Sequence, residues 1–112
     1  MLQSNAFLVS GGTDWVREWD RQRAVLRHLL GAIDHEGLEP AAALLQRVRE
    51  CRRRVAEPPA PLVRQLWDAA LEEAWQAACC ALYGDLGPAR EHAEAAENSM
   101  EEMRLMLESW LD

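Results

Sequence analysis

The sequence contains no lysine, since all twelve of its basic residues are arginine. A chain without lysine has neither a Schiff-base nucleophile nor the lysine of a phosphate-binding P-loop. Serine is also scarce, and none stands in the G-x-S-x-G elbow of an activated nucleophile; the serines are Ser4, Ser10, Ser99 and Ser109. We therefore predict no catalytic residue, and we expect that the protein is not an enzyme.

Cysteine is present in an odd number, as Cys51, Cys79 and Cys80, and no two are spaced as in a C-x-x-C metal or redox site. A bridge between adjacent cysteines in a helix would be severely strained. These features favour a cytoplasmic protein with reduced thiols. Free cysteine is often buried, so we expect Cys79 and Cys80 to be buried structural residues.

Long apolar runs are missing as well. The longest, Ala77 to Tyr83, is far shorter than the roughly 20 residues that a helix needs to span a membrane. Residues 1–12 lack the basic start of a secretory signal and end in a pair of glycines. We interpret residues 1–12 as a flexible N-terminal arm and residues 13–112 as a single domain, and we expect no membrane partner.

Two stretches of the chain repeat apolar residues at alternating spacings of four and three. That period is typical of a helix buried along one stripe. The C-terminal stretch has Ala89, Ala93, Ala96, Met100, Met103, Leu107 and Trp110, and the N-terminal one has Trp15, Trp19, Leu26, Leu29 and Ile33, with Gln22 in the slot between. The protein is therefore predicted to be built from helices packed against helices.

Proline and glycine divide the chain into four such helices. We expect the first from Thr13, as N-cap, to Asp34, the second to begin around Pro40, the third to cover about 61–83, and the last to follow Pro88. The predicted fold is all-α, a small antiparallel bundle of about four helices arranged as two helical hairpins. The residues expected in its core include Trp19, Leu26, Leu45, Leu66 and Ala77.

Charge is unevenly distributed along this acidic chain, whose net charge is −7. Residues 39–57 hold five arginines and three glutamates, whereas residues 85–112 hold eight acids and two arginines. The acidic total disfavours nucleic acid as a partner, although the arginine patch leaves a nucleic-acid-binding regulator as a third hypothesis. A docking surface for an acidic protein segment, or for the acidic last helix of a second copy, explains the patch better.

A methionine-rich stripe in the last helix is the other candidate for partner binding. Methionine is flexible and polarizable and adapts to varied partners, although the same stripe would also serve as core. The predicted partner-binding residues are Met100, Met103, Met106, Trp110, Arg47, Arg49 and Arg53. We expect a homodimer that buries part of this stripe.

These patterns predict a small cytoplasmic adaptor, assembly chaperone or regulatory subunit that binds another protein by helix packing. The alternative is a helical bundle that binds a metal or small ligand, with a thiol redox role for Cys79 and Cys80. His28, His35 and His92 are its possible imidazole ligands, but the Glu-x-x-His pairs of di-iron bundles do not occur. We therefore predict no metal site and no cofactor.

Overall fold

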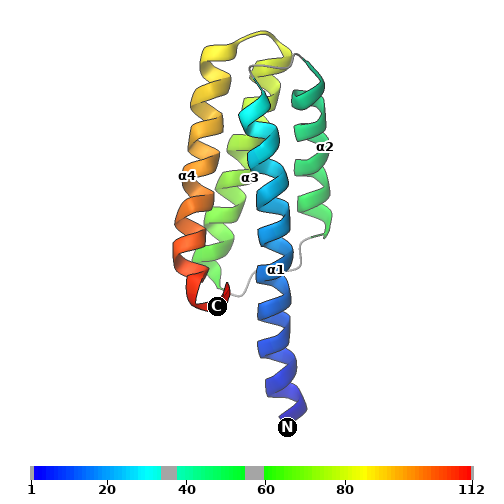
Figure 1. Ribbon diagram of the computed structural model, residues 1–112, viewed down its shortest axis with the longest axis vertical. Coiled ribbons are helices and arrows are strands. Elements are labelled where there is room, and N and C mark those ends of the chain that lie inside the picture. The colour runs from blue at the N-terminus through cyan, green and yellow to red at the C-terminus, as the bar shows by residue number, and fades with distance from the viewer. Residues whose placement is uncertain (1, 34–37, 55–59, 112) are drawn as a thin grey trace.

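The computed structural model describes residues 2–33, 38–54 and 60–111, and their side chains except those of residues 2–14, 54 and 109–111. The chain forms four helices, α1 (Leu2–Ala32), α2 (Leu38–Arg54), α3 (Pro61–Leu82) and α4 (Leu86–Leu111) (Figure 1). No strand occurs within the described ranges, which confirms the predicted all-α fold. None of the helices described is long and apolar enough to cross a membrane.

The helices pack side by side in an elongated bundle of 55 × 22 × 21 Å. The α3–α4 contact is the most extensive; α2 packs against α3, and α1 packs against both α2 and α4. Within the described residues α2 and α4 do not touch, so they occupy opposite corners, with α4 on the left and α2 on the right of Figure 1. Surfaces on α2 and on the outer side of α4 therefore face in different directions.

Helix α1 begins at Leu2, so the prediction that it starts at Thr13 was wrong. No proline precedes Thr13 to end the helix. A glycine inside a helix costs only about 1 kcal/mol relative to alanine, so Gly11 and Gly12 weaken the helix without breaking it. The added turns extend α1 beyond the ends of the other helices, as the blue ribbon shows (Figure 1). Whether this segment is flexible remains a prediction.

The predicted core lies between the four helices. Trp19, Leu26 and Ala77 are buried as expected, whereas Leu45 and Leu66 are only half-buried at its margin. Trp15 stacks on Trp19 with ring centroids 6.4 Å apart. The ring of Trp67 in α3 meets Trp19 edge-on at 6.5 Å, so these aromatic rings join α1 to α3 in one half of the bundle.

The two ends of α3 follow from local sequence. Pro61 occupies its first turn, where the missing N–H costs nothing. After Leu82 the chain reverses at Gly84, whose φ of 86° is a conformation that favours glycine. The amide of Gly84 donates to the carbonyl of Ala81 at 3.0 Å, and that of Asp85 donates to the carbonyl of Cys80 at 2.8 Å. This turn places α4 directly against α3.

Candidate protein-docking face

One side of the bundle is formed jointly by α2 and α3. Residues 38, 42, 45, 49 and 52 follow one another at spacings of four and three, so they lie along one stripe of α2. Residues 72, 75, 79 and 82 form the matching stripe of α3. The two stripes are neighbours because Arg52 Nη2 lies 3.2 Å from Glu72 Oε2. We call this surface the α2–α3 face: Leu38, Ala42, Leu45, Arg49, Arg52, Glu72, Trp75, Cys79, Leu82 and, at its end, Tyr83.

Trp75 lies at the middle of the α2–α3 face. Its half-buried ring has the guanidinium groups of Arg49 and Arg52 over it, at 5.4 and 5.8 Å from its centroid. Gln76 Nε2 donates a hydrogen bond to Glu72 Oε1 at 3.1 Å. This bond and the nearby Arg52 lower the pKa of the Glu72 carboxyl, so it stays charged. Trp75 is thus an aromatic ring with two cations over it.

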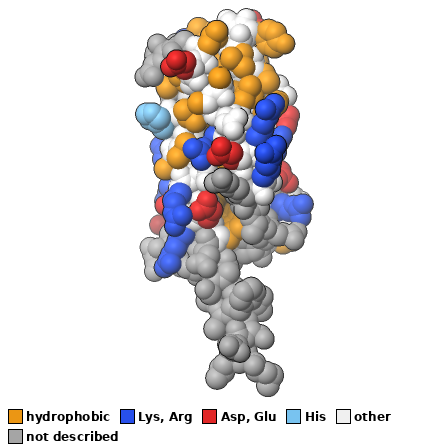
Figure 2. Space-filling model, turned by 90° about the vertical axis from the view of Figure 1, so that its right-hand side faces the viewer, with side chains coloured by type: hydrophobic (Ala, Val, Ile, Leu, Met, Phe, Trp, Pro, Cys, Tyr) orange, Lys and Arg blue, Asp and Glu red, His pale blue; other side chains and the backbone are white. Residues whose placement is uncertain are grey.

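Beyond Trp75 the α2–α3 face becomes apolar. Leu38 is 61% exposed and Tyr83 is 86% exposed, although both are large hydrophobic side chains. Ala42 is also exposed, and Leu45, Cys79 and Leu82 are half-buried. Figure 2, which views this side of the molecule, shows hydrophobic side chains gathered over its upper part and arginines below them. Such a clustered apolar surface is typical of a site that binds another macromolecule.

Arg47, one of the three predicted partner-binding arginines, lies on a different side of α2. Its Nη1 is 3.2 Å from Glu50 Oε2 and 3.4 Å from Gln22 Oε1 in α1. Gln22 also accepts a hydrogen bond from Cys51 Sγ at 3.5 Å. Burial is the main cause that raises the pKa of the Cys51 thiol, from 9.0 to about 11. This network fixes the register of α1 against α2 and leaves Arg47 engaged within the fold.

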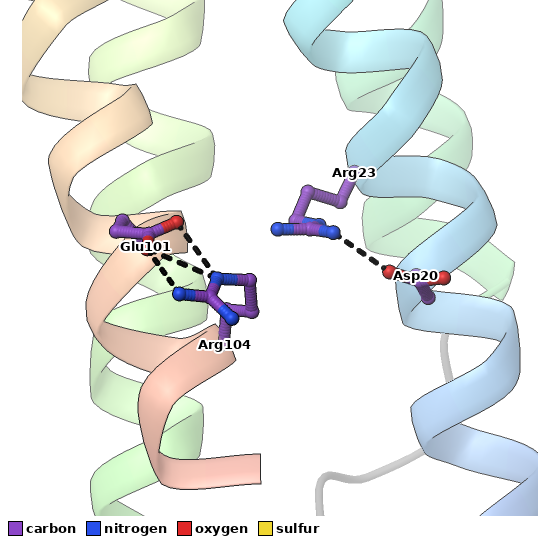
Figure 3. A network of polar contacts seen from close by, with 4 residues as sticks. All are labelled: Asp20, Arg23, Glu101 and Arg104. Atoms are coloured by element: carbon purple, nitrogen blue, oxygen red, sulfur yellow. Dashed lines mark hydrogen bonds and ion pairs between the residues drawn. The ribbon is translucent and has the colours of Figure 1, made fainter. Parts of the chain in front are cut away.

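The opposite side of the bundle, between α1 and α4, carries charges that already have partners. Arg23 Nη2 lies 3.0 Å from Asp20 Oδ1 on α1, and Arg104 Nη2 lies 2.6 Å from Glu101 Oε1 on α4. Figure 3 shows the guanidinium of Arg23 extending from α1 towards α4. The bond from Arg104, with lesser contributions from Arg23 and Arg27, lowers the pKa of Glu101.

Two buried donors, Arg23 Nε and Trp19 Nε1, have no hydrogen-bond partner in the described part of the chain. Leaving such groups unsatisfied opposes folding, so these two donors offset part of the stability that the packing of α1 supplies.

The methionine-rich stripe is divided between core and surface. Met100 and Met103 are buried inside the bundle, so in the folded protein these side chains pack against their own helices and are closed to a partner. Met106 is 42% exposed. The backbone of Trp110 belongs to α4, but its side chain lies outside the described residues. Of the three methionines in this part of α4, Met106 is therefore the one placed to contact another molecule.

The thiols and histidines are scattered over the bundle. Cys79 and Cys80 are half-buried, so the prediction that both are buried was wrong; alanines take the core positions of that part of α3, whereas Cys51 is buried. His92 Nδ1 lies 2.6 Å from Glu73 Oε2 and links α4 to α3. His28 is exposed, and His35 lies outside the described residues. Among the described side chains, no group of three or more His, Cys, Asp or Glu could hold a metal ion.

Of the predicted partner-binding residues, Arg49 lies on the α2–α3 face and Arg53 follows it one turn later on α2, whereas Leu38 and Tyr83 were not among the predicted residues. Leu38 precedes the expected start of α2, and Tyr83 ends α3, so neither belonged to a recognised stripe. The spacing of residues 38, 42 and 45 was the available signal. Comparisons of the chain with protein-family models, curated proteins and solved structures gave no match.

Proposed function

We propose that this protein is a cytoplasmic adaptor, assembly chaperone or regulatory subunit that acts by binding another protein, and that the α2–α3 face is where the partner helix packs. The observation that carries this proposal is the exposure of Leu38 and Tyr83 at one end of that face. Large apolar side chains that gather on one surface lower the free energy when a partner covers them.

The composition of the α2–α3 face supports this proposal. Tyrosine, tryptophan and arginine are the residue types enriched where interfaces are strongest, and the face contains Tyr83, Trp75 and Arg49. Trp75 already contacts two guanidinium groups, so a partner would meet side chains whose arrangement is set before binding. Pre-organisation reduces the entropy lost on binding.

Self-association through α3 and α4 remains a separate prediction. Leu62 is 53% exposed and Met106 is 42% exposed, so both are available for contact with a second copy. The measurement is light scattering over a wide range of protein concentration. A monomer mass at every concentration would exclude the dimer without bearing on the α2–α3 face.

Site-specific photocrosslinking in the native cells tests the proposed function. A photoreactive amino acid at position 83 should give a covalent adduct with one defined protein, in a complex that survives purification. The matched control is position 98, where Asn98 is also exposed but lies on α4. Equal labelling of the same protein from both positions, or no adduct from position 83, would contradict docking at the α2–α3 face.

A further inference from the structure

The α2–α3 face has two halves of different chemistry. Leu38, Leu82 and Tyr83 lie towards the start of α2 and the end of α3, because the two helices run in opposite directions. Arg49 and Arg52 lie three to four turns further along α2. A partner that covers the whole surface must therefore be apolar at one end and suited to arginine at the other.

Among the described residues, the arginine half of this surface is only partly neutralised. Arg52 has Glu72 as its partner, whereas Arg49 contacts only the Trp75 ring, and neither Arg49 nor the neighbouring Arg53 forms an ion pair with any described residue. Both guanidinium groups belong to exposed residues. Two positive charges that no described carboxylate pairs, lying beside an apolar surface, select for negative charge at the edge of a partner.

We infer that the occupant of the α2–α3 face is an amphipathic helix of another protein, with an apolar stripe over Leu38, Leu82 and Tyr83 and carboxylates beside Arg49 and Arg53. This inference rests on the proposed function and specifies its partner. The stripe from residue 38 to residue 52 is about 21 Å long at 1.5 Å per residue, so a helix of about four turns covers it.

A second copy of this chain does not satisfy the same requirements. Its acidic surface is the outer side of α4, where Glu91, Glu94 and Glu102 are exposed, and α4 lies across the bundle from α2 (Figure 1). Pairing the α2–α3 face of one copy with α4 of the next is head-to-tail, which builds rings or open chains of molecules and not a closed dimer. A separate acidic helix closes the face without this consequence.

Two synthetic amphipathic peptides of 16 residues provide the probe. Both carry the same leucine stripe. In one half of each peptide the positions beside this stripe are Glu in the first peptide and Lys in the second. We expect the Glu peptide to bind at least tenfold more tightly than the Lys peptide in 20 mM salt, measured by fluorescence anisotropy. The preference should shrink in 300 mM salt, because the arginines are exposed and screened.

Variants of the protein locate the effect. R49E/R53E should reverse the preference between the two peptides, and R53E alone, which leaves the Trp75 contact intact, should reduce it. R17E/R27E changes two exposed arginines of α1 by the same total charge and should preserve the preference. Circular dichroism should show equal helix content for all of these variants.

The outcomes separate the inference from the proposed function. If both peptides bind equally and Leu82→Asp weakens both, the α2–α3 face is a docking site but the acidic partner is wrong. Equal effects of R17E/R27E and R49E/R53E would also overturn the inference, since net charge alone would then explain the preference. Failure of the Glu peptide to bind at 1 mM would also overturn the inference. Crosslinking at position 83 tests the proposed function independently of the peptides.

Discussion

The two sides of α3 differ in the size of their side chains and in how completely they are covered. Towards α4, around the Glu73–His92 contact, α3 presents buried alanines such as Ala70, Ala77 and Ala81. Towards α2 it presents Glu72, Trp75, Cys79 and Leu82, none of which is fully buried. The α3–α4 contact is also far more extensive than the α2–α3 contact.

This difference separates residues that hold the bundle together from residues that remain available to a partner. Small side chains let α3 and α4 approach closely and exclude water, since interiors are packed with few voids. Large side chains on the α2 side keep part of their surface in water, at a cost that a partner helix would remove. The α3–α4 seam thus carries folding, and the α2–α3 face carries the proposed binding.

The largest expected effect on stability is in the α3–α4 half. Met103→Ala should lower the free energy of unfolding by about 2–5 kcal/mol, because a fully buried side chain is replaced by a cavity. Met106→Ala is the matched control on the same helix, at a position that is 42% exposed, and should cost about 0.5 kcal/mol or less. Urea denaturation measures both. Equal losses would mean that the stripe is not divided between core and surface.

Larger side chains should be tolerated on the exposed surface of α3 but not where α3 packs against α4. Ala77→Leu should destabilise the protein by about 1–3 kcal/mol, since the buried position has no room for the larger side chain. Ala69→Leu makes the same change at an exposed position of α3 and should alter stability by no more than about 0.5 kcal/mol. A tolerated Ala77→Leu would show that α3 and α4 are not closely packed.

Alkaline pH should weaken the α1–α2 contact through Cys51. The pKa of this thiol is about 11 in the folded protein against 9.0 for a free thiol, so its contribution is intact below pH 9 and is lost as the pH rises towards 11. At pH 10 the loss should be about 1 kcal/mol. Urea unfolding curves at pH 8 and pH 10 measure this decrease in the free energy of unfolding. In the control variant Cys51→Ala the decrease caused by the thiol should be absent.

The α2–α3 face should show the smallest effect on stability. Tyr83→Asp should change the free energy of unfolding by no more than about 0.5 kcal/mol, because the side chain is 86% exposed. The same variant should bind the Glu peptide at least tenfold more weakly, since it places a carboxylate beside the apolar half. A large loss of stability without loss of binding would make Tyr83 a structural residue.

Much of the fold was readable from the sequence because the relevant signals are local. The spacing of four and three predicted buried stripes in the first and last helices, and Pro61 and Gly84 mark the start and end of α3 as expected. The start of α1 was not predicted correctly, because Gly11 and Gly12 weaken a helix without necessarily ending it.

The candidate site was less predictable because it depends on how the helices pack. Whether Met103 or Met106 is buried depends on how α4 is rotated about its own axis in the bundle. The spacing of the methionines in the sequence does not determine that rotation. The stacking of Arg49 and Arg52 on Trp75 joins residues from two helices, and no short-range pattern relates them. Surfaces made by two elements are therefore seen only once the packing is known.

The α2–α3 face as the docking site for an acidic helix is tested most directly by mapping where such a helix binds. Titration of the Glu peptide into ¹⁵N-labelled protein, followed by amide chemical shifts, locates the contact residue by residue. We predict that the changes concentrate in residues 38–53 and 72–83 and leave the outer side of α4 unaffected. Changes centred on α4, or on the α1–α4 seam, would contradict the account.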